Sequence, residues 1–297
     1  MLDLSIIIVN WNTKKLLKNC ITSIYRYPPD FSYEVIVVDN ASTDSSKNMV
    51  KEHFPEVKLI QNPSNLGFAS ANNLGVESSQ GRNILFLNSD TLVHLGTLAG
   101  AVKFMASHPE AGIMGCKTLN VDGTLQPTAY GFPSIIRMFS FVIGMNRILK
   151  LSRFKDLSKI RTPGYIQGSF LLVRKNVLEE VGKFDDKFFM YSEDIDLCHR
   201  VKLAGWKAYY YPEINITHFG GGSIKDSKQA LESFIRSIIY LYRKHRSFGE
   251  LKLLKIAIVF ALIFRALIDF LSSFIRLRPI KKETIHFYRS LISTTMK

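Results

Sequence analysis

The residues best suited to chemistry lie at the end of an apolar run, Phe86-Leu87-Asn88-Ser89-Asp90. A strand that ends in a carboxylate places an ionised oxygen at the rim of a sheet, where the ligands of open α/β sheets collect. A hard divalent cation at such a rim takes oxygen ligands from one or two acids and from phosphates. Asp is also preferred at the start of a helix. The residues alone therefore leave Asp90 as either a metal ligand or a helix cap.

Three other apolar runs also end in polar side chains. They end at Asn10, at Asp39 and at Gln61, and amides, acids and hydroxyls follow each of them. No Gly-x-Gly-x-x-Gly turn follows the first run and no Gly-Lys-Ser/Thr loop occurs, which disfavours both glycine-rich ways of holding a phosphate. Asp39 is well placed to bond a ribose or a base, with a helix cap as the alternative.

The elements that must position these residues follow an alternating pattern. Short β-branched runs alternate with helical patterns, which predicts right-handed crossovers and a mostly parallel, doubly wound α/β sheet over residues 1–116. The predicted strands are Leu4–Asn10, Glu34–Asp39, Val57–Gln61 and Asn83–Asn88. The clearest helix is Thr13–Tyr27, with Thr13 as its N-cap and Pro28-Pro29 at its end.

The second half of the pattern is less regular. Asp122-Gly123 is typical of a hairpin turn, and Tyr165–Val173 is predicted to be a strand. Trp206–Tyr211 is predicted to be a strand that follows a helix ending at Gly205.

The basic charge of the chain is concentrated in two segments. The formal net charge is +14, and residues 225–297 hold 15 Lys and Arg against 5 Asp and Glu. Residues 133–161 hold 7 against 1, which leaves the rest of the chain close to neutral. Both segments are also rich in Phe, Ile and Leu, which indicates an anionic membrane surface and argues against nucleic acid as a partner.

The C-terminal segment Leu253–Leu277 is strongly apolar, but Arg265 and Asp269 interrupt it. Its longest uninterrupted run, Ile256–Phe264, is too short to span a bilayer. Basic residues on both sides fit a helix that lies in the membrane interface. A tilted span with a paired Arg265 and Asp269, or a helix packed in the domain or in a dimer, stays open. Arg137–Arg161 is predicted to be a second membrane contact.

The compartment follows from the cysteines and the N-terminus. Cys20, Cys116 and Cys198 occur singly, which suggests neither a disulfide framework nor a zinc site and favours a reducing compartment. The chain enters an apolar strand directly, without the pattern of a secretory signal. We therefore expect the protein at the cytoplasmic face of the plasma membrane, peripheral or monotopic.

Five motifs, in this order, resemble the inverting family 2 glycosyltransferases with the GT-A fold, and in particular their rhamnosyltransferase-like branch. The resemblance covers roughly residues 4–222. The motifs are Ile8–Asn12, Val37–Asp44, Asn65–Ala69 with Asn72-Asn73, Leu87–Asp90 and Phe189–Leu197. The fold that this implies is a Rossmann-like α/β domain with, in this chain, a C-terminal helical extension.

The resemblance implies a donor site and a metal. Asn10 and Asp39 would contact the base or ribose, and Asn65, Asn88 and Ser89 would lie at the donor. Asp90 would hold a divalent metal, Mg²⁺ or Mn²⁺, on the diphosphate. Many relatives have Asp-x-Asp where this chain has Asn88-Ser89-Asp90, so the diphosphate must supply much of the coordination. His218 stands where the family has a histidine and would be a second ligand, although a lone His is as readily structural.

Inverting transfer needs a base that takes the proton of the acceptor hydroxyl. Ser192 is predicted to cap a helix that runs to about Ala204, which puts Glu193 and Asp194 in a first turn whose dipole favours carboxylates. The resemblance marks Asp194 as the base and Glu193 as an acceptor or sugar contact. An acidic first turn that serves stability alone is the alternative.

A weaker part of the resemblance concerns Gln167, Gly168 and Ser169, which the family pattern places near the transferred sugar. A glycine in a strand can equally mark a bulge or close packing.

Together these expectations describe a bacterial enzyme of cell-surface polysaccharide synthesis. It would move a sugar, such as rhamnose or another deoxyhexose, from a nucleotide-diphosphate donor to a lipid-linked saccharide. Residues 1–224 would form the GT-A domain, with a nucleotide-sugar half at 1–116 and an acceptor half at 117–224, and residues 225–297 a membrane-associating extension. A homo-oligomer stays open.

Two readings from other classes also stay open. One is a non-catalytic membrane-binding module that has kept a nucleotide pocket, which turnover would exclude. The other is a nucleotidyltransferase, which would need a first loop rich in Gly and Arg that Asn10-Trp11-Asn12 does not supply.

Overall fold

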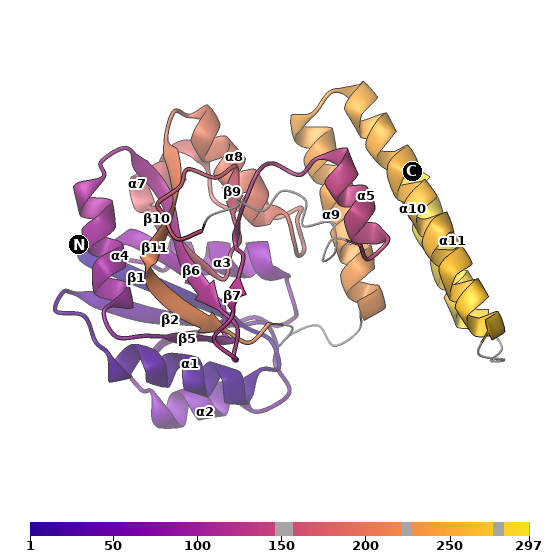
Figure 1. Ribbon diagram of the computed structural model, residues 1–297. Helices are drawn as coiled ribbons and strands as arrows, with labels where there is room; N and C mark the ends of the chain where they lie inside the picture. Colours follow the sequence, from indigo (N-terminus) through magenta and orange to yellow (C-terminus); the bar gives the residue numbers. More distant parts are fainter. Residues whose placement is uncertain (146–156, 221–226, 276–281, 297) are drawn as a thin grey trace. The chain divides into compact units, whose positions relative to one another are not determined.

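The computed structural model describes residues 1–145, 157–220, 227–275 and 282–296, with helices and strands labelled in Figure 1. Contacts within the chain divide it into two units. Unit 1 consists of residues 1–131 and 154–225, and unit 2 of residues 132–153 and 226–297. Residues 132–153 therefore group with the C-terminal helices, although the predicted boundary at 224 and 225 assigned them to the acceptor half. The functional division of the chain stays a prediction.

Unit 1 is built on one mixed sheet in the order β3-β2-β1-β4-β10-β6-β11-β5, with β7 paired to β6. Its strands are β1 (Leu2–Asn10), β2 (Tyr33–Asp39), β3 (Lys58–Gln61), β4 (Gly81–Leu87), β5 (Thr91–Val93), β6 (Ala111–Leu119), β7 (Leu125–Gln126), β10 (Phe170–Arg174) and β11 (Lys207–His218). The first four strands are parallel, and β11 is parallel to β6. β10 runs antiparallel between β4 and β6.

Helices cover both faces of this sheet, because successive side chains of a strand point to opposite faces. Leu4, Ile6 and Ile8 of β1 share one buried cluster with Leu17 and Ile21 of α1. On the other face Ile7 lies against α3, where a Cβ on Gly75 would come within 2.4 Å of the Ile7 side chain. The helices of unit 1 are α1 (Lys14–Arg26), α2 (Ser46–His53), α3 (Phe68–Glu77), α4 (Thr97–Ser107), α7 (Lys175–Val181) and α8 (Glu193–Leu203).

The predicted doubly wound, mostly parallel α/β sheet is confirmed. The four predicted N-terminal strands agree with β1 to β4 to within two residues at each end. Thr13 directly precedes α1 as predicted, but its hydroxyl makes no capping bond and instead donates to Asn10 Oδ1 at 2.6 Å.

The predicted strand Tyr165–Val173 is wrong in one respect. It is divided into β9 (Tyr165–Ile166), which pairs with β8 (Ala129–Tyr130) in a separate two-stranded sheet, and β10 in the main sheet. The residues between them bond elsewhere, because the Gln167 backbone N–H donates to the Thr128 carbonyl and the Gly168 N–H donates to the Asp194 carboxylate. Periodicity along the chain carries no signal for such long-range partners.

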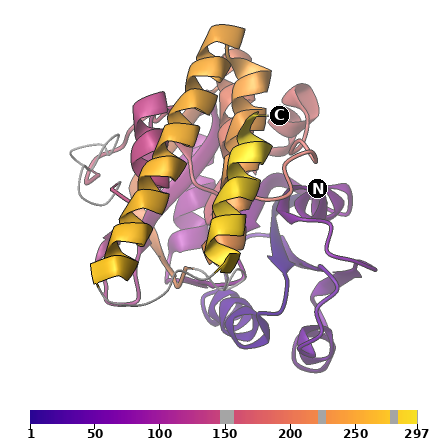
Figure 2. The same ribbon diagram turned by 90° about the vertical axis from the view of Figure 1, so that its right-hand side faces the viewer.

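Unit 2 is helical and contains α5 (Ile135–Val142), α9 (Ser227–His245), α10 (Phe248–Ile275) and α11 (Lys282–Met296). Ser134 caps α5 by accepting from the Arg137 backbone N–H. Figure 2 shows α10 and α11 side by side. Among the described residues, no helix combines the length and the apolar character of a membrane span. Residues 146–156 of the predicted membrane contact Arg137–Arg161, and residues 276–281 with the basic side chains that follow the apolar segment, lie outside the described residues.

Candidate active site

The ends of β1, β2 and β4 are joined by a chain of buried hydrogen bonds. Ser89 Oγ lies 2.9 Å from Thr13 Oγ1, and Thr13 donates to Asn10 Oδ1. Asn10 Nδ2 in turn donates to Asp39 Oδ1 and to Ser42 Oγ, both at 2.9 Å. Three of the predicted donor residues therefore belong to one network. Because buried polar groups are stable only when they are paired, this network fixes the shape of the rim.

The network decides which atoms remain for a ligand. Both amide hydrogens of Asn10 are engaged and its side chain is fully buried, so Asn10 supports the rim from below. Asp39 Oδ1 accepts from Asn10 and Oδ2 accepts from the Ser42 backbone N–H at 3.0 Å, which leaves one lone pair on each oxygen for a ribose or a base. The alternative that Asp39 caps a helix is wrong, since the next helix begins at Ser46.

Asn65 lies in a tight turn that leads into α3. Its Oδ1 accepts from the Gly67 N–H at 3.0 Å, and the Gly67 carbonyl accepts from Asn40 Nδ2 at 3.0 Å. Gly67 has a φ of +84°, which favours glycine. The turn is thus tied to the end of β2, where Asn40 follows Asp39.

Asp90 and His218 meet at the end of β4, as the metal hypothesis requires. His218 Nε2 lies 3.2 Å from Asp90 Oδ1 and 3.4 Å from Asn88 Nδ2. His218 is the last residue of β11, which is longer than the predicted strand Trp206–Tyr211. The alternative that Asp90 caps a helix is wrong, because the short strand β5 follows it.

The chemistry of this pair fits a divalent cation. His218 Nδ1 lies 2.6 Å from Gln126 Oε1, which only accepts, so Nδ1 carries a proton and Nε2 is the ring atom that faces Asp90. At 3.2 Å, Nε2 and Asp90 Oδ1 can share a proton as an ion pair, and a divalent cation that displaced this proton would be held by both atoms. Neighbouring ligands of Mg²⁺ or Mn²⁺ lie about 3 Å apart. Among the residues described, no group of three or more His, Cys, Asp or Glu side chains converges, so phosphate oxygens would complete the coordination.

Asp194, the predicted base, is buried in the first turn of α8. Its Oδ2 accepts from the Gly168 N–H at 2.9 Å and its Oδ1 from the Ile195 N–H at 2.8 Å. Burial raises the pKa of Asp194 to about 6, and the two backbone donors oppose that rise. A carboxylate with this pKa is ionised at neutral pH and more basic than an exposed Asp, as a general base requires.

Glu193 differs from its neighbour in charge state. It is buried, its Oε2 has no hydrogen-bond partner, and burial together with Asp194 raises the pKa of Glu193 well above its ordinary value. Two adjacent buried acids cannot both ionise cheaply. The proton therefore resides on Glu193 while Asp194 carries the negative charge.

The expected cap at Ser192 is wrong. Tyr191 and Ser192 both have positive φ, at 70° and 68°, and Ser192 Oγ is buried without a hydrogen-bond partner. A side chain caps a helix from an extended backbone, which a left-handed Ser192 does not have. The helix α8 nevertheless begins at Glu193 and extends to Leu203, close to the prediction.

The segment that holds Asp194 and the segment that leads to Asp90 are hydrogen-bonded to each other where β4 ends and β10 begins. The Asn88 backbone N–H donates to the Ser169 carbonyl at 3.2 Å, and the residue before Ser169 holds Asp194. Gly168 and Ser169 are buried here, whereas the side chain of Gln167 is exposed. Of the residues predicted to contact the acceptor or sugar, Gly168 supports Asp194 through its backbone N–H. The roles of the Gln167, Ser169 and Glu193 side chains stay predictions.

Four residues of this site were missed from the sequence. Gln126 orients His218 although 92 positions separate them, and no local pattern reveals such a pair. Asn40, Gly67 and Asn73 hold the turn and the segment in front of α8. All three residues belong to the motifs that carry the family resemblance, so the sequence marked their positions. It did not predict which residues they contact.

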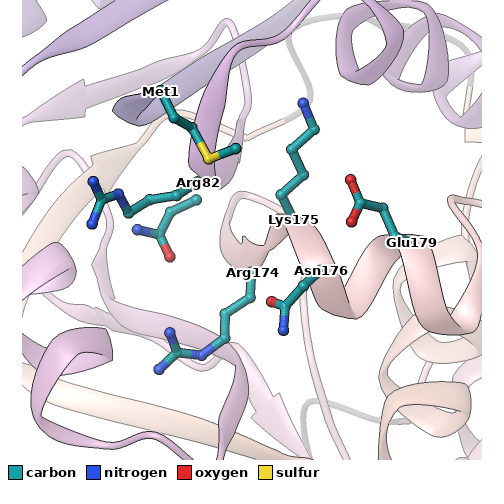
Figure 3. A pocket seen from close by; sticks show the side chains of 7 residues that line it. Met1, Arg82, Arg174, Lys175, Asn176 and Glu179 are labelled. Carbon is teal, nitrogen blue, oxygen red and sulfur yellow. The ribbon is translucent and has the colours of Figure 1, made fainter.

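A cavity of about 230 Å³ lies at the opposite end of the strands (Figure 3). Its lining residues are Met1, Arg82, Asn83, Arg174, Lys175, Asn176 and Glu179. Arg174 donates to three backbone carbonyls, Lys175 donates to the Ser79 carbonyl, and Arg82 lies 3.4 Å from Asp3. Because these three cations already have partners in the chain, we do not assign the cavity to the donor.

Comparison with known proteins places the chain in a family. The model of the family described as Glycosyl transferase family 2 matches residues 5–182. An N-acetylglucosaminyl-diphospho-decaprenol L-rhamnosyltransferase of Mycobacterium tuberculosis is 30% identical over 206 residues, which are 62% of this chain and 66% of that protein. Rhamnosyltransferase WbbL of Escherichia coli K12 is 30% identical over 217 residues, 69% of this chain and 78% of that protein. The chain thus matches just under two thirds of the mycobacterial relative's length.

Solved structures share the fold. GalNAc-T7 with UDP, GalNAc and Mn²⁺ has a TM-score of 0.62 at 15% identity, covering 82% of this chain and 48% of that one. The mannosyltransferase PcManGT of Pyrobaculum calidifontis, in complex with GDP-Man and Mn²⁺, has a TM-score of 0.58 at 17% identity, covering 100% and 86%. The predicted GT-A fold is confirmed.

The charge state of Glu193 gives the first prediction. The folded protein keeps a proton on Glu193 that the unfolded chain releases above about pH 4.5, so stability falls as pH rises from there toward the raised pKa. Glu193→Gln cannot ionise, so its stability relative to wild type should grow as pH rises above about 4.5, by up to about 1.4 kcal/mol per pH unit, and level off once pH passes the raised pKa. Thermal unfolding measures this, with the exposed Glu179→Gln as control. A pH-independent difference would contradict the assignment.

Proposed function

The chain belongs to glycosyl transferase family 2, and on that premise we propose that it is an inverting, metal-dependent glycosyltransferase. Its donor is a nucleotide-diphosphate sugar, with rhamnose or another deoxyhexose as the sugar. Its acceptor is a lipid-linked saccharide at the cytoplasmic face of the membrane, in cell-surface polysaccharide synthesis. Two relatives named as rhamnosyltransferases support the sugar, and the name of one includes a diphospho-decaprenol-linked N-acetylglucosamine.

One observation carries this proposal. A buried carboxylate with the basicity of a general base, Asp194, is linked through Gly168 and Ser169 to the end of the strand that leads to Asp90. Proton removal and diphosphate stabilisation are the two requirements of a single displacement at an anomeric carbon. The rim supplies one residue for each: Asp90 follows β4, and Asp194 of α8 is held by Gly168, just before the adjacent strand β10.

Asp194 acts on the acceptor in the proposed reaction. The acceptor hydroxyl loses its proton to Asp194 as its oxygen bonds to the anomeric carbon, while the bond from that carbon to the diphosphate breaks. The electron pair of that bond leaves with the nucleotide diphosphate, and the configuration inverts because attack and departure lie on opposite sides. The Gly168 and Ile195 backbone donors keep the carboxylate oriented throughout.

Asp90 and His218 act on the leaving group. Asp90 Oδ1 and His218 Nε2 would hold a divalent cation, with Gln126 fixing the histidine tautomer. That cation, when bound, neutralises the charge that develops on the diphosphate. Asp39 would accept from the base or ribose through its remaining lone pairs, and the Asn65 turn would close the donor site.

An apolar face of α10 supports the membrane surface as a partner. Nine large apolar side chains of this helix are 42% to 65% exposed: Leu253, Ile256, Phe260, Ile263, Phe264, Leu267, Ile268, Phe270 and Leu271. The three charged residues of the same stretch bond within unit 2. Lys255 Nζ donates to the Met296 carbonyl at 3.4 Å, Arg265 donates to the Val142 carbonyl at 3.0 Å, and Asp269 accepts from Tyr288 Oη at 2.7 Å. The exposed face is therefore apolar over its length.

Lipid fits this face better than a second copy of the chain. Helices that pair through an apolar seam carry charged residues beside it, and the run Ile256–Phe264 has none. The net positive charge of residues 225–297 favours an anionic leaflet.

Asp194→Asn tests the catalytic role. Because it removes the base and keeps the shape, transfer should fall at least about 100-fold while the donor Kd changes less than about threefold. In the wild type, the rate should fall as pH drops below about 6, the value to which burial raises the pKa of Asp194. Steady-state kinetics and equilibrium binding check both, with the exposed Asp30→Asn as control. Equal losses of transfer and donor binding would make Asp194 a structural residue.

Leu267→Asp tests the membrane face. Placing a charge in the buried face of a bound helix should weaken binding to phosphatidylglycerol vesicles at least about tenfold. Leu95→Asp is the matched control, because Leu95 is 80% exposed in unit 1. Cosedimentation measures binding, and the oligomeric state is measured alongside. Unchanged vesicle binding of Leu267→Asp, or a wild-type dimer that ignores vesicles, would contradict the proposal.

A further inference from the structure

The segment in front of the base, residues 182–192, has no helix or strand of its own, and we call it the base loop. Arg200 of α8 holds its beginning. The guanidinium donates to the carbonyls of Val181, Gly182 and Lys183 at 2.6 to 2.8 Å, and its Nε bonds Asp196 at 2.8 Å. By bonding three successive carbonyls, Arg200 fixes the backbone at the point where the base loop follows α7.

Helix α3 holds the base loop at two further points, Phe184 and Phe189. Asn73 makes a two-point contact with the backbone of Phe184, with Nδ2 donating to its carbonyl at 2.8 Å and Oδ1 accepting from its N–H at 3.0 Å. At the start of α3 the Phe68 N–H donates to the Phe189 carbonyl at 2.8 Å. The loop that leads to Asp194 is therefore anchored on a donor-side helix.

The anchor at Phe189 depends on close backbone approach. A Cβ on Gly67 would lie 2.5 Å from the Phe189 carbonyl oxygen, so a side chain at this position would push the base loop away. Asn40 fixes Gly67 from the other side through the bond from its Nδ2 to the Gly67 carbonyl. Asn40 is itself fixed by Asn62 Nδ2, which donates to its Oδ1 at 2.7 Å.

Between Phe189 and Asp194 the backbone is strained. Tyr191 and Ser192 are consecutive non-glycine residues at positive φ, a conformation that persists only when the surroundings impose it. If the anchors at Phe184 and Phe189 were lost, these residues could relax and the Asp194 carboxylate would shift. A shift of 1 Å in a catalytic group costs about 100-fold in rate.

We propose that the turn Asn65–Gly67 couples donor binding to the placement of Asp194, with Asn40 and Asn73 as positioning residues. A donor that contacts the turn stabilises α3 and its two anchors, and thereby orders the base loop before the acceptor binds. This inference rests on the proposed function, since it concerns the base and donor named there.

Asn40→Ala and Asn73→Ala test the coupling, with Asn83→Ala as the matched control. Asn83 is buried like Asn40, at 5% and 2% exposure, and its amide also donates to a backbone carbonyl, that of Asp3 at 3.1 Å, but at the other end of the strands. Three quantities are measured for each variant: the donor Kd, kcat at saturating substrates, and amide hydrogen exchange of residues 184–194 with and without donor.

The two positioning variants should lose about 10- to 100-fold in kcat while the donor Kd changes less than about threefold. Donor should slow exchange of residues 184–194 in wild type and Asn83→Ala, and not in the positioning variants. Equal kcat losses in all three variants, or donor-induced protection that survives in the positioning variants, would overturn the coupling. Asn73→Ala carries the test if Asn40→Ala does not fold. A wild type that transfers no sugar would refute the proposed function instead.

Discussion

The constraint on which this site depends is the direction of β10, which runs antiparallel to both of its neighbours. β10 enters between β4 and β6 in the opposite direction, so its first residues lie beside the last residues of β4. The hydrogen bond from the Asn88 N–H to the Ser169 carbonyl marks this meeting point. With β10 parallel, Gly168 would lie at the other end of the sheet. The topology thus brings the support of Asp194 and the strand that carries Asp90 to one rim.

Burial then sets the chemistry of the rim. Four acids of the rim are buried, and their hydrogen-bonding partners differ: Asp39, Asp90, Glu193 and Asp194. Asp39 is paired by amide and backbone donors, Asp90 faces His218, and Asp194 has two backbone donors. Glu193 Oε2 has no partner, and the proton stays there. The proposed roles of these similar acids, as ribose acceptor, metal ligand, neutral acid and base, rest on these differences in hydrogen bonding.

The sequence predicted what depends on local pattern. Apolar alternation located the first four strands, and polar residues at their ends located the rim. It did not predict what depends on distant partners. Ser192 was expected to be a cap, but its backbone conformation belongs to a loop anchored on Gly67 and Asn73. Likewise Gln126 meets His218 only through the pairing of β7 with β6 and of β6 with β11.

Equilibrium binding of nucleotide sugars is the most direct test of the central claim, that this rim holds a metal-bound nucleotide-diphosphate sugar. The panel contains thymidine-, uridine- and guanosine-diphosphate sugars, measured with Mg²⁺ or Mn²⁺ and again with a chelator. The account predicts preference for one donor that depends on metal and is weakened by Asp90→Asn. Folded protein that binds no donor, or binds one equally well with chelator, would contradict it.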